Sequence, residues 1–236
     1  MATIDSIEIG SGVKGLIFDY GGTLDSRGDH WAQVIRDAYV AAGVDVGLDD
    51  FIKAYIHAER ALAANPLIDT ADTFRELMRK KIAVEMQWLA EHCDGFEFVG
   101  ESRQCGTVTL SESEKGNEIA NWCYEHARKC VGESAIVLRR LRERYPMVLV
   151  SNFYGNLQAV IADFGISDCF KAVVESASVG VRKPDPAIFR LGLDALGLSA
   201  SEVLVVGDSL DKDILPARSL GCQTALLTGR RWPPTD

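Results

Sequence analysis

The chain has 236 residues, of which 47% are hydrophobic and 25% charged, a composition typical of a folded globular protein rather than a disordered one. Its formal net charge of -9 leaves no broad basic surface, so we expect no nucleic-acid partner and no anionic-membrane partner. The N-terminal segment lacks the pattern of a secretory signal, and no apolar run approaches the roughly 20 residues of a membrane helix. The six cysteines lack the spacing of a disulfide framework. Together these features predict a cytoplasmic protein with reduced thiols.

Short apolar runs alternate with helical patterns along the chain, as is typical of parallel strands that are buried on both faces. The predicted strands are Gly15–Phe18, Met147–Val150, Lys171–Val174, Val203–Val206 and Thr224–Leu227. We therefore predict an α/β fold with a doubly wound parallel sheet and flanking helices.

A long segment, residues 28–131, separates the first two predicted strands and has a different, helical pattern. Apolar residues recur at helical spacing over Trp31–Ala42 and over Phe74–Trp88, where Lys81 is a polar exception. Asn117–Val131 is predicted to form another helix. A segment of this length exceeds a crossover connection, so we expect an inserted helical domain.

The predicted domains are a core formed by residues 1–27 and 132–236 and an inserted helical cap over residues 28–131. Within the cap, Asp94–Ser113 is rich in Gly, Ser, Thr and Glu and predicts a loop or small hairpin. The tail Trp232–Asp236 contains two prolines and is expected to leave regular structure. We expect the cap to close over the strand ends and exclude water.

Polar residues follow several predicted strands at their carboxyl ends, the edge where open α/β sheets bind ligands. The first strand leads into Asp19, Tyr20, Gly21, Gly22 and Thr23. A carboxylate beside backbone N–H groups that two glycines leave accessible suits nucleophilic attack on phosphorus, with Gly22 and Thr23 next to the developing anion.

Three further segments supply a hydroxyl, a lysine and acidic groups. The second predicted strand ends at Ser151-Asn152, where a hydroxyl can donate to a phosphoryl oxygen. Lys183 is followed by Pro184 and Pro186 and then by a predicted helix, and a lysine fixed by these prolines can hold charge in register. Asp208 follows the fourth strand, with Asp213 five residues later. Mg²⁺ prefers a site with one or two carboxylates, in which it keeps several waters and binds phosphate oxygens of the substrate. Each piece alone is more often a cap or turn, but their order favours one phosphate-handling site.

This order of Asp, Ser, Lys and then Gly-Asp-x4-Asp resembles the haloacid dehalogenase superfamily of hydrolases over nearly the whole chain, with a helical cap inserted after the first motif. The resemblance implies that Asp19 forms an aspartyl-phosphate, that Ser151 binds phosphate and that Lys183 stabilises the charged intermediate. The phosphate-binding residues that it implies are Gly22, Thr23, Ser151, Asn152 and Lys183. The Mg²⁺ ligands that it implies are Asp19, the backbone carbonyl of Gly21, Asp208 and Asp213. The expected reaction is Mg²⁺-dependent hydrolysis of a small phosphorylated metabolite; the oligomeric state has no signal in the sequence.

The chain departs from the family's phosphatases at Gly21, where they carry a second Asp that protonates the leaving group. General acid–base help is typically worth about 10²–10⁴-fold, so its loss is a handicap unless it is replaced. The nearby candidates for a replacement are Asp25, Asp29, His30 and Asp211. Alternatively, the leaving group needs no proton, or the chemistry is not phosphoester hydrolysis.

Two branches of the family also lack that Asp. The 2-haloacid dehalogenases use no metal and do not keep the Gly-Asp motif that Asp208 forms here. Phosphonoacetaldehyde hydrolases keep the metal but need a cap lysine that forms a Schiff base, for which the candidates are Lys53, Lys80 and Lys81. A catalytically weakened relative that binds a phosphorylated ligand or a protein is a further alternative.

Cysteine and histidine gather on one predicted cap helix. Cys123, His126 and Cys130 share a face, with His92, Cys93 and Cys105 upstream, and such a face could bind zinc. Small cysteines at this spacing more often pack against neighbouring helices.

Overall fold

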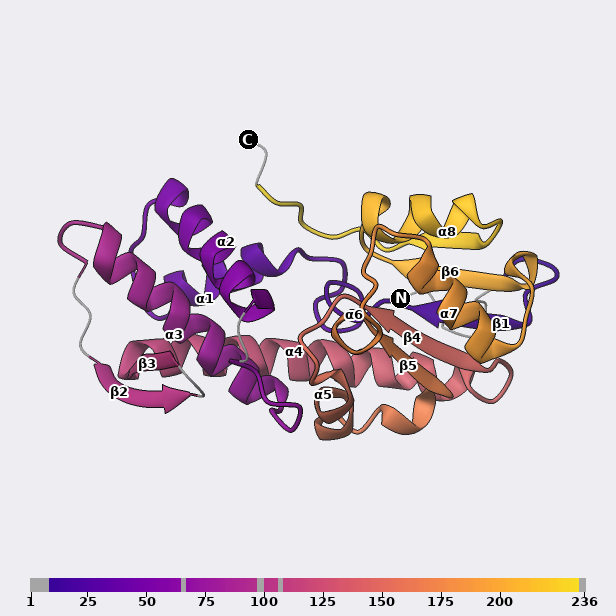
Figure 1. Ribbon diagram of the computed structural model, residues 1–236, viewed down its shortest axis with the longest axis horizontal. Helices are drawn as coiled ribbons and strands as arrows, with labels where there is room; N and C mark the ends of the chain where they lie inside the picture. Colours follow the sequence, from indigo (N-terminus) through magenta and orange to yellow (C-terminus); the bar gives the residue numbers. More distant parts are fainter. Residues whose placement is uncertain (1–8, 65–66, 97–99, 106–107, 234–236) are drawn as a thin grey trace. The chain divides into compact units, whose positions relative to one another are not determined.

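The computed structural model describes residues 9–64, 67–96, 100–105 and 108–233, with the backbone alone described from 100 to 112 (Figure 1). The chain divides into two compact units. The first unit contains Met1–Asp29, Lys129–Phe153 and Phe164–Gly229, and the second contains His30–Arg128, Tyr154–Asp163 and Arg230–Asp236. In the described ranges, no helix combines the length and the apolarity needed to cross a membrane.

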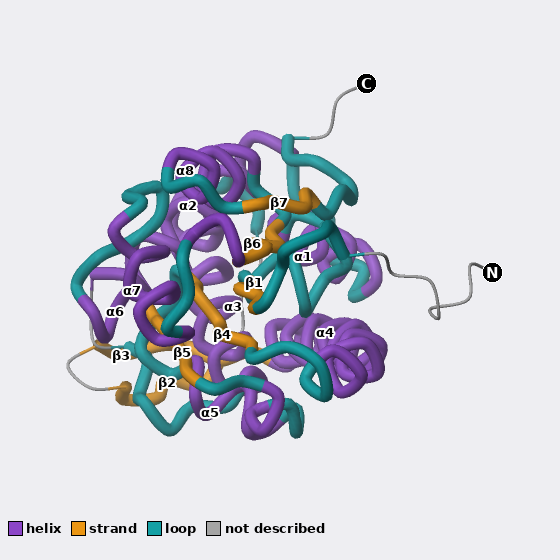
Figure 2. Tube along the Cα trace, turned by 90° about the vertical axis from the view of Figure 1, so that its right-hand side faces the viewer, coloured by secondary structure: helices purple, strands orange, loops and turns teal. Residues whose placement is uncertain are grey.

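The first unit is built on a parallel sheet of five strands in the order β5-β4-β1-β6-β7, which Figure 2 shows as a row. The strands are β1 (Gly15–Phe18), β4 (Met147–Ser151), β5 (Ala172–Glu175), β6 (Val203–Gly207) and β7 (Gln223–Leu226). Because the chain adds β4 and β5 on one side of β1 and then β6 and β7 on the other, the sheet is doubly wound, as predicted. Every predicted strand end lies within one residue of the observed one.

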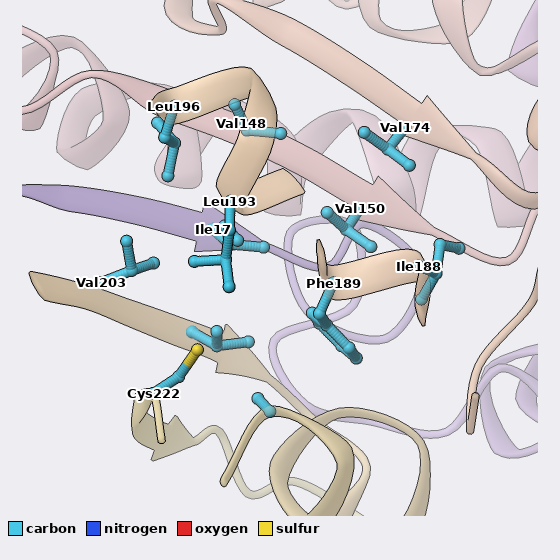
Figure 3. Packing of buried hydrophobic residues seen from close by; sticks show 12 residues of the cluster. Ile17, Val148, Val150, Val174, Ile188, Phe189, Leu193, Leu196, Val203 and Cys222 are labelled. Carbon is cyan, nitrogen blue, oxygen red and sulfur yellow. The ribbon is translucent and has the colours of Figure 1, made fainter. Parts of the chain in front are cut away.

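Helix α7 (Ala187–Leu196) shows how the core of the first unit is packed (Figure 3). Its apolar face, which includes Phe189 and Leu193, lies against alternate residues of the strands, among them Ile17 and Val150. Gly192 lies at the contact, where a Cβ would be 2.9 Å from Val150 Cγ2 and 3.0 Å from Ile17 Cδ1. The missing side chain therefore lets α7 approach the sheet closely. The other helices of this unit are η2 (Ser167–Cys169), α6 (Ser176–Val179), η3 (Ala200–Glu202), η4 (Leu210–Ile214) and α8 (Leu215–Ser219).

Helix α4 (Glu114–Leu141) is longer than the sequence predicted, and the boundary between the units falls within it. The prediction ended this helix at Val131, before Gly132, a residue type that often follows a helix end. The helix continues because the next turns have buried partners: Ala135 and Leu138 are buried, and Ser134 Oγ donates to the carbonyl of Leu24 at 2.9 Å.

The second unit is mostly helical, with one small hairpin. Its helices are α1 (Trp31–Ala41), α2 (Leu48–Ala64), α3 (Phe74–His92), the part of α4 up to Arg128, and α5 (Leu157–Asp163). The hairpin pairs β2 (Gly100–Cys105) with β3 (Val108–Ser113) in antiparallel register, in the segment where a loop or small hairpin was predicted. Helix α3 begins with a capping box, because Thr73 and Glu76 satisfy each other's backbone N–H groups.

The second unit also contains two segments that sequence alone assigned to the core, Tyr154–Asp163 and the tail from Arg230. The tail is held at three points. The N–H of His30 donates to the carbonyl of Arg230 at 3.1 Å, the Arg230 guanidinium lies 2.6 Å from Asp37, and the Trp232 ring contacts Phe51 edge-on. Residues 230–232 are therefore a structural part of the second unit.

All four tryptophans of the chain lie in the second unit, each with a histidine ring beside it. Trp88 stacks on His92 with ring centroids 4.3 Å apart, and Trp122 stacks on His126 at 5.6 Å. The remaining pairs are Trp31 with His126 and Trp232 with His30.

Candidate active site

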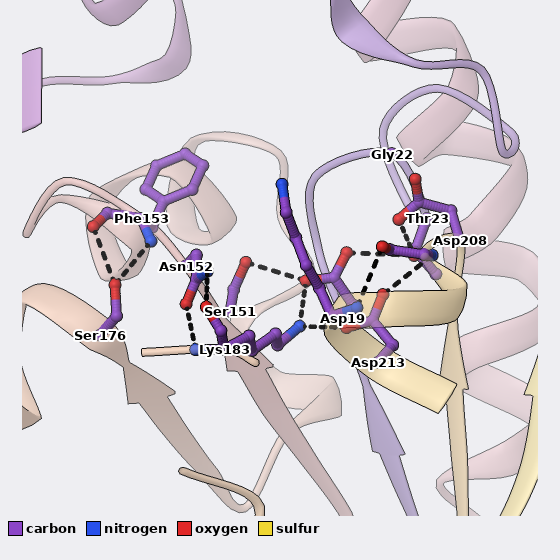
Figure 4. Close-up of polar contacts among 12 residues, drawn as sticks. Asp19, Gly22, Thr23, Ser151, Asn152, Phe153, Ser176, Lys183, Asp208 and Asp213 are labelled. Carbon is purple, nitrogen blue, oxygen red and sulfur yellow. Dashed lines mark hydrogen bonds and ion pairs between the residues drawn. The ribbon is translucent and has the colours of Figure 1, made fainter. Parts of the chain in front are cut away.

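Three adjacent strands deliver the polar residues of the site. Asp19 directly follows β1, Ser151 ends β4, and Asp208 follows β6 (Figure 4). In register, Phe18 pairs with Leu149 on one side and Val206 on the other, so the three strands end together. The carboxyl ends of adjacent parallel strands thus bring the carboxylates and the hydroxyl to one edge of the sheet.

The Asp19 carboxylate is buried, and both of its oxygens have hydrogen-bond donors. Lys183 Nζ lies 2.6 Å from Oδ1, and Ser151 Oγ donates to the same oxygen at 3.1 Å. Thr23 Oγ1 donates to Oδ2 at 3.1 Å and lies 3.3 Å from Oδ1 of Asp208. A charged donor on a buried carboxylate forms a strong hydrogen bond and fixes the orientation of the carboxylate.

Lys183 is 4% exposed and bridges two carboxylates. Its Nζ lies 2.6 Å from Asp213 Oδ1, the same distance as from Asp19, while Asp213 Oδ2 accepts the N–H of Ser209 at 3.0 Å. Burial by itself lowers the pKa of Lys183, but Asp19 and Asp213 together outweigh it and raise this pKa above the ordinary lysine value. The lysine therefore stays protonated.

The three carboxylates of Asp19, Asp208 and Asp213 carry more negative charge than Lys183 neutralises. Burial, followed by the charges of Asp19 and Asp213, raises the pKa of Asp208 to about 7. Burial and Asp19 also raise the pKa of Asp213. One oxygen from each carboxylate lies within 4.8 Å of the others. When all three are ionised, this partly buried set of oxygens carries two negative charges more than Lys183 neutralises, which fits a divalent cation, so this cluster could bind a metal.

Gly21 lies in the turn that follows β1, and a Cβ on it would meet nothing within 4 Å. Of the candidates for the missing acid, Asp25 is 1% exposed and its Oδ1 accepts the N–H of Gly22 at 2.8 Å, so it supports the loop. His30 belongs to the second unit, where its Nδ1 accepts the N–H of Ala32 at the start of α1. Asp211 is exposed on η4.

Asn152 and Ser176 have roles that sequence reasoning missed. The Asn152 amide bonds to the backbone of Lys183, and Ser176 Oγ bonds to the backbone of Phe153. Both contacts join segments far apart in the sequence, and an amide or hydroxyl that pairs with backbone leaves no residue pattern to find.

A second polar cluster lies inside the second unit, around the lysine that interrupts the apolar pattern of α3. Lys81 is 3% exposed, forms an ion pair with Glu59 and lies 4.5 Å above the Tyr55 ring. Tyr154 Oη donates to Glu59 Oε2 at 2.8 Å. Burial lowers the pKa of Lys81, but Glu59 leads the interactions that raise it well above the ordinary lysine value. This lysine is a charged, paired group.

Glu85 belongs to the same cluster, one turn after Lys81 on α3. It is fully buried, and its Oε2 accepts the hydroxyl of Tyr39 at 3.2 Å. Burial raises the pKa of Glu85 to about 7 although Lys81 and Tyr39 act in the opposite direction.

The cysteines proposed as zinc ligands lie in packed surroundings. Cys123 and Cys130 are buried, and the His126 ring stacks on Trp122. Within the described ranges, the one group of three or more His, Cys, Asp or Glu side chains close enough to share a metal is Asp19, Asp208 and Asp213. Cys105 lies where only the backbone is described.

The comparisons with known proteins agree with this architecture. A model of the haloacid dehalogenase-like hydrolases matches residues 13–221. Haloacid dehalogenase-like hydrolase domain-containing protein 3 of Danio rerio is 43% identical over 79 residues, which span 34% of this chain and only 33% of that protein. Phosphoglycolate phosphatase of Pectobacterium atrosepticum is 27% identical over 217 residues, or 92% of this chain and 80% of that protein.

A solved structure of a dehalogenase with an intermediate complex shares the fold, with a TM-score of 0.58 at 17% identity, over 96% of this chain and 90% of the other. The matched range covers nearly the whole chain and contains Asp19, Ser151, Lys183 and Asp208. The protein belongs to the haloacid dehalogenase-like hydrolases.

Proposed function

We propose that this protein hydrolyses a small phosphorylated metabolite, with Asp19 as the nucleophile and Mg²⁺ as the cofactor. The observation that carries the proposal is the pair of donors on Asp19 Oδ1, Lys183 Nζ at 2.6 Å and Ser151 Oγ at 3.1 Å, at the ligand-binding edge of the sheet. A relative that matches most of the chain is named a phosphatase, which supports the same reaction class.

In this proposal an oxygen of Asp19 attacks phosphorus, and an Asp19 O–P bond forms as the bond to the leaving-group oxygen breaks. Water then attacks the phosphorus of the aspartyl-phosphate, which releases inorganic phosphate and regenerates the carboxylate. The Ser151 hydroxyl, which donates to Asp19 Oδ1 in the free site, turns to donate to a phosphoryl oxygen when the substrate is bound, and Lys183 stays protonated beside Asp19 to balance the charge of the transferring group.

Asp19, Asp208 and the carbonyl of Gly21 would hold Mg²⁺, with Asp213 behind them on Lys183 and the Ser209 N–H. Mg²⁺ neutralises charge on phosphoryl oxygens and polarises them when it is bound. The two excess negative charges of the cluster and its oxygen-only ligands support this assignment.

Gly21 cannot protonate a leaving group, and the carboxyl of Asp25 is engaged with the loop that it supports. We therefore expect faster turnover of esters whose leaving group is stable as an anion. Alkyl esters, which need a proton from water, should react more slowly by much of the roughly 10²–10⁴-fold that a general acid supplies.

The phosphonoacetaldehyde hydrolase alternative, which would break a C–P bond, needs an uncharged lysine amine in the second unit. Each of its candidates has an acidic partner instead: Lys81 pairs with Glu59, Lys80 with Asp72, and Lys53 with Asp50. Glu59 and Asp50 raise the pKa values of Lys81 and Lys53, and a protonated ammonium cannot form a Schiff base. The contacts of these lysines therefore favour the phosphatase.

Phosphate release from para-nitrophenyl phosphate and from a panel of alkyl phosphates, with Mg²⁺ or a chelator, tests the proposal. Wild type should release phosphate only with Mg²⁺, most rapidly from the nitrophenyl ester, and Asp19→Asn should release none while its thermal unfolding stays cooperative. Activity that persists in Asp19→Asn would exclude the nucleophile. Absence of release from every ester would reject the phosphatase for these substrates.

A further inference from the structure

Asn152 makes a two-point contact with the backbone of Lys183 (Figure 4). The N–H of Lys183 donates to Asn152 Oδ1 at 2.9 Å, and Asn152 Nδ2 donates to the carbonyl of Lys183 at 3.1 Å. One amide therefore satisfies both backbone groups of a single residue, and the reverse assignment of its oxygen and nitrogen would satisfy neither.

Lys183 needs such a contact because no strand or helix holds its backbone. It lies between α6, which ends at Val179, and α7, which begins at Ala187. Its side chain has four rotatable bonds, yet Nζ must stay 2.6 Å from both Asp19 and Asp213. A shift of the backbone would move the ammonium away from one of these carboxylates.

We infer that Asn152 is a positioning residue that sets the place of Lys183 through its backbone, an inference that rests on the proposed function of Asp19. The residue before it, Ser151, bonds directly to Asp19. The end of β4 thus orients the nucleophile twice, once through the hydroxyl of Ser151 and once through the lysine that Asn152 holds. In this role the amide of Asn152 does not contact the substrate.

The same loop provides a matched control. Ser176 Oγ accepts the N–H of Phe153 at 3.2 Å and lies 3.4 Å from the carbonyl of the same residue. This contact also joins a side chain to both backbone groups of one residue, and it lies next to Asn152 in the chain. It does not involve Lys183, so its loss should affect the loop without moving the ammonium.

The experiment compares Asn152→Leu and Asn152→Ala with Ser176→Ala and wild type, using para-nitrophenyl phosphate at saturating Mg²⁺. We expect both Asn152 variants to lower kcat by about 10–100-fold with KM changed by less than about threefold, because a displaced charge weakens the transition state rather than ground-state binding. Ser176→Ala should stay within about twofold of wild type in both constants. Thermal unfolding of each variant checks that it is folded.

Amide hydrogen exchange supplies a readout that does not depend on activity. The peptide around Lys183 contains Pro184 and Pro186, which have no N–H, so the exchange of the few remaining amides is easily separated. We expect the Lys183 amide to exchange at least about tenfold faster in the Asn152 variants and at the wild-type rate in Ser176→Ala.

Each outcome decides the inference. Loss of kcat together with loss of Lys183 protection supports it. Loss of activity with the Lys183 amide still protected, or a raised KM at unchanged kcat, would overturn it and give Asn152 a direct contact with substrate. Asn152 variants that match Ser176→Ala in both readouts would overturn it as well. If wild type hydrolyses no phosphate, the proposed function fails, and the exchange rates alone decide whether Asn152 holds Lys183.

Discussion

The carboxylate of Asp208 rests directly on the backbone of Gly22: a Cβ at residue 22 would lie 2.5 Å from Oδ2 and 2.7 Å from Oδ1. Gly22 also has a φ of 92°, in the left-handed region that favours glycine. The turn after β1 and the acidic residue after β6 therefore fit together only because residue 22 has no side chain.

This contact predicts that Gly22→Ala displaces Asp208. We expect a loss of about 1–3 kcal/mol in the free energy of unfolding from strain and steric overlap, and at least a tenfold loss of Mg²⁺-dependent phosphatase activity. Urea unfolding measures the first effect, and phosphate release from para-nitrophenyl phosphate at saturating Mg²⁺ measures the second. The matched control is Gly21→Ala, since its Cβ would meet nothing within 4 Å and Gly21 has no positive φ. Equal losses in the two variants would contradict the prediction.

The open space beside Gly21 predicts a gain of activity in Gly21→Asp. A carboxyl group there can protonate the leaving oxygen, so kcat for alkyl phosphates should rise by about tenfold or more, whereas the nitrophenyl ester should gain little. Gly21→Asn has nearly the same shape but no acidic proton, and it should show no gain. A wild type that already turns over alkyl phosphates as fast as Gly21→Asp would mean that another group supplies the proton.

The buried ion pair of Lys81 with Glu59 predicts that removing Lys81 lowers the free energy of unfolding more than removing the exposed Lys53 does. Lys81→Met leaves Glu85 buried and Glu59 half-buried without their cation, and we expect a loss of about 2–3 kcal/mol in the free energy of unfolding. This value lies below the usual range for a buried pair because the Glu59 side chain is 37% exposed. Lys53→Met removes an exposed pair with Asp50 and should change stability little. Denaturant unfolding followed by circular dichroism would detect the difference; similar values for both variants would refute it.

Glu85 predicts a pH dependence of stability. Its pKa is about 7 in the folded protein, against about 4.3 when it is unfolded, so the folded state binds more protons between these values. The neutral carboxyl therefore makes its whole contribution to the free energy of unfolding below the unfolded pKa. That contribution is lost as the pH rises through the folded pKa. Glu85→Gln keeps an acceptor for Tyr39 but cannot ionise.

Between pH 5 and pH 8, the free energy of unfolding of wild type should fall by about 1–3 kcal/mol more than that of Glu85→Gln. Urea unfolding at a series of pH values measures this difference. Glu91→Gln, an exposed change on the same helix, should follow the wild-type curve. Parallel curves for wild type and Glu85→Gln would show that Glu85 does not titrate in this range.

The sheet was predictable because buried parallel strands are continuous apolar runs, and the polar residue that ends each run marks the ligand-binding edge. On that basis Asp19, Ser151 and Asp208 could be placed together before any coordinates. The length of α4 was not predictable, since Gly132 resembles a helix end and only the burial of Ala135 and Leu138 shows that the helix continues. The contact of Asn152 with Lys183 was equally hidden, because it depends on how two loops pack and uses the backbone of one of them.

Because all four tryptophans lie in the second unit, the tryptophan fluorescence of the protein reports on that unit alone. Indole emission follows only the environment of His30–Arg128 and of Trp232, whereas circular dichroism records the helices and strands of both units. Unfolding curves recorded by emission and by dichroism on the same sample therefore monitor different sets of residues. Coincident midpoints would mean that the two units melt as one cooperative body, and separated midpoints would give the stability of the second unit by itself.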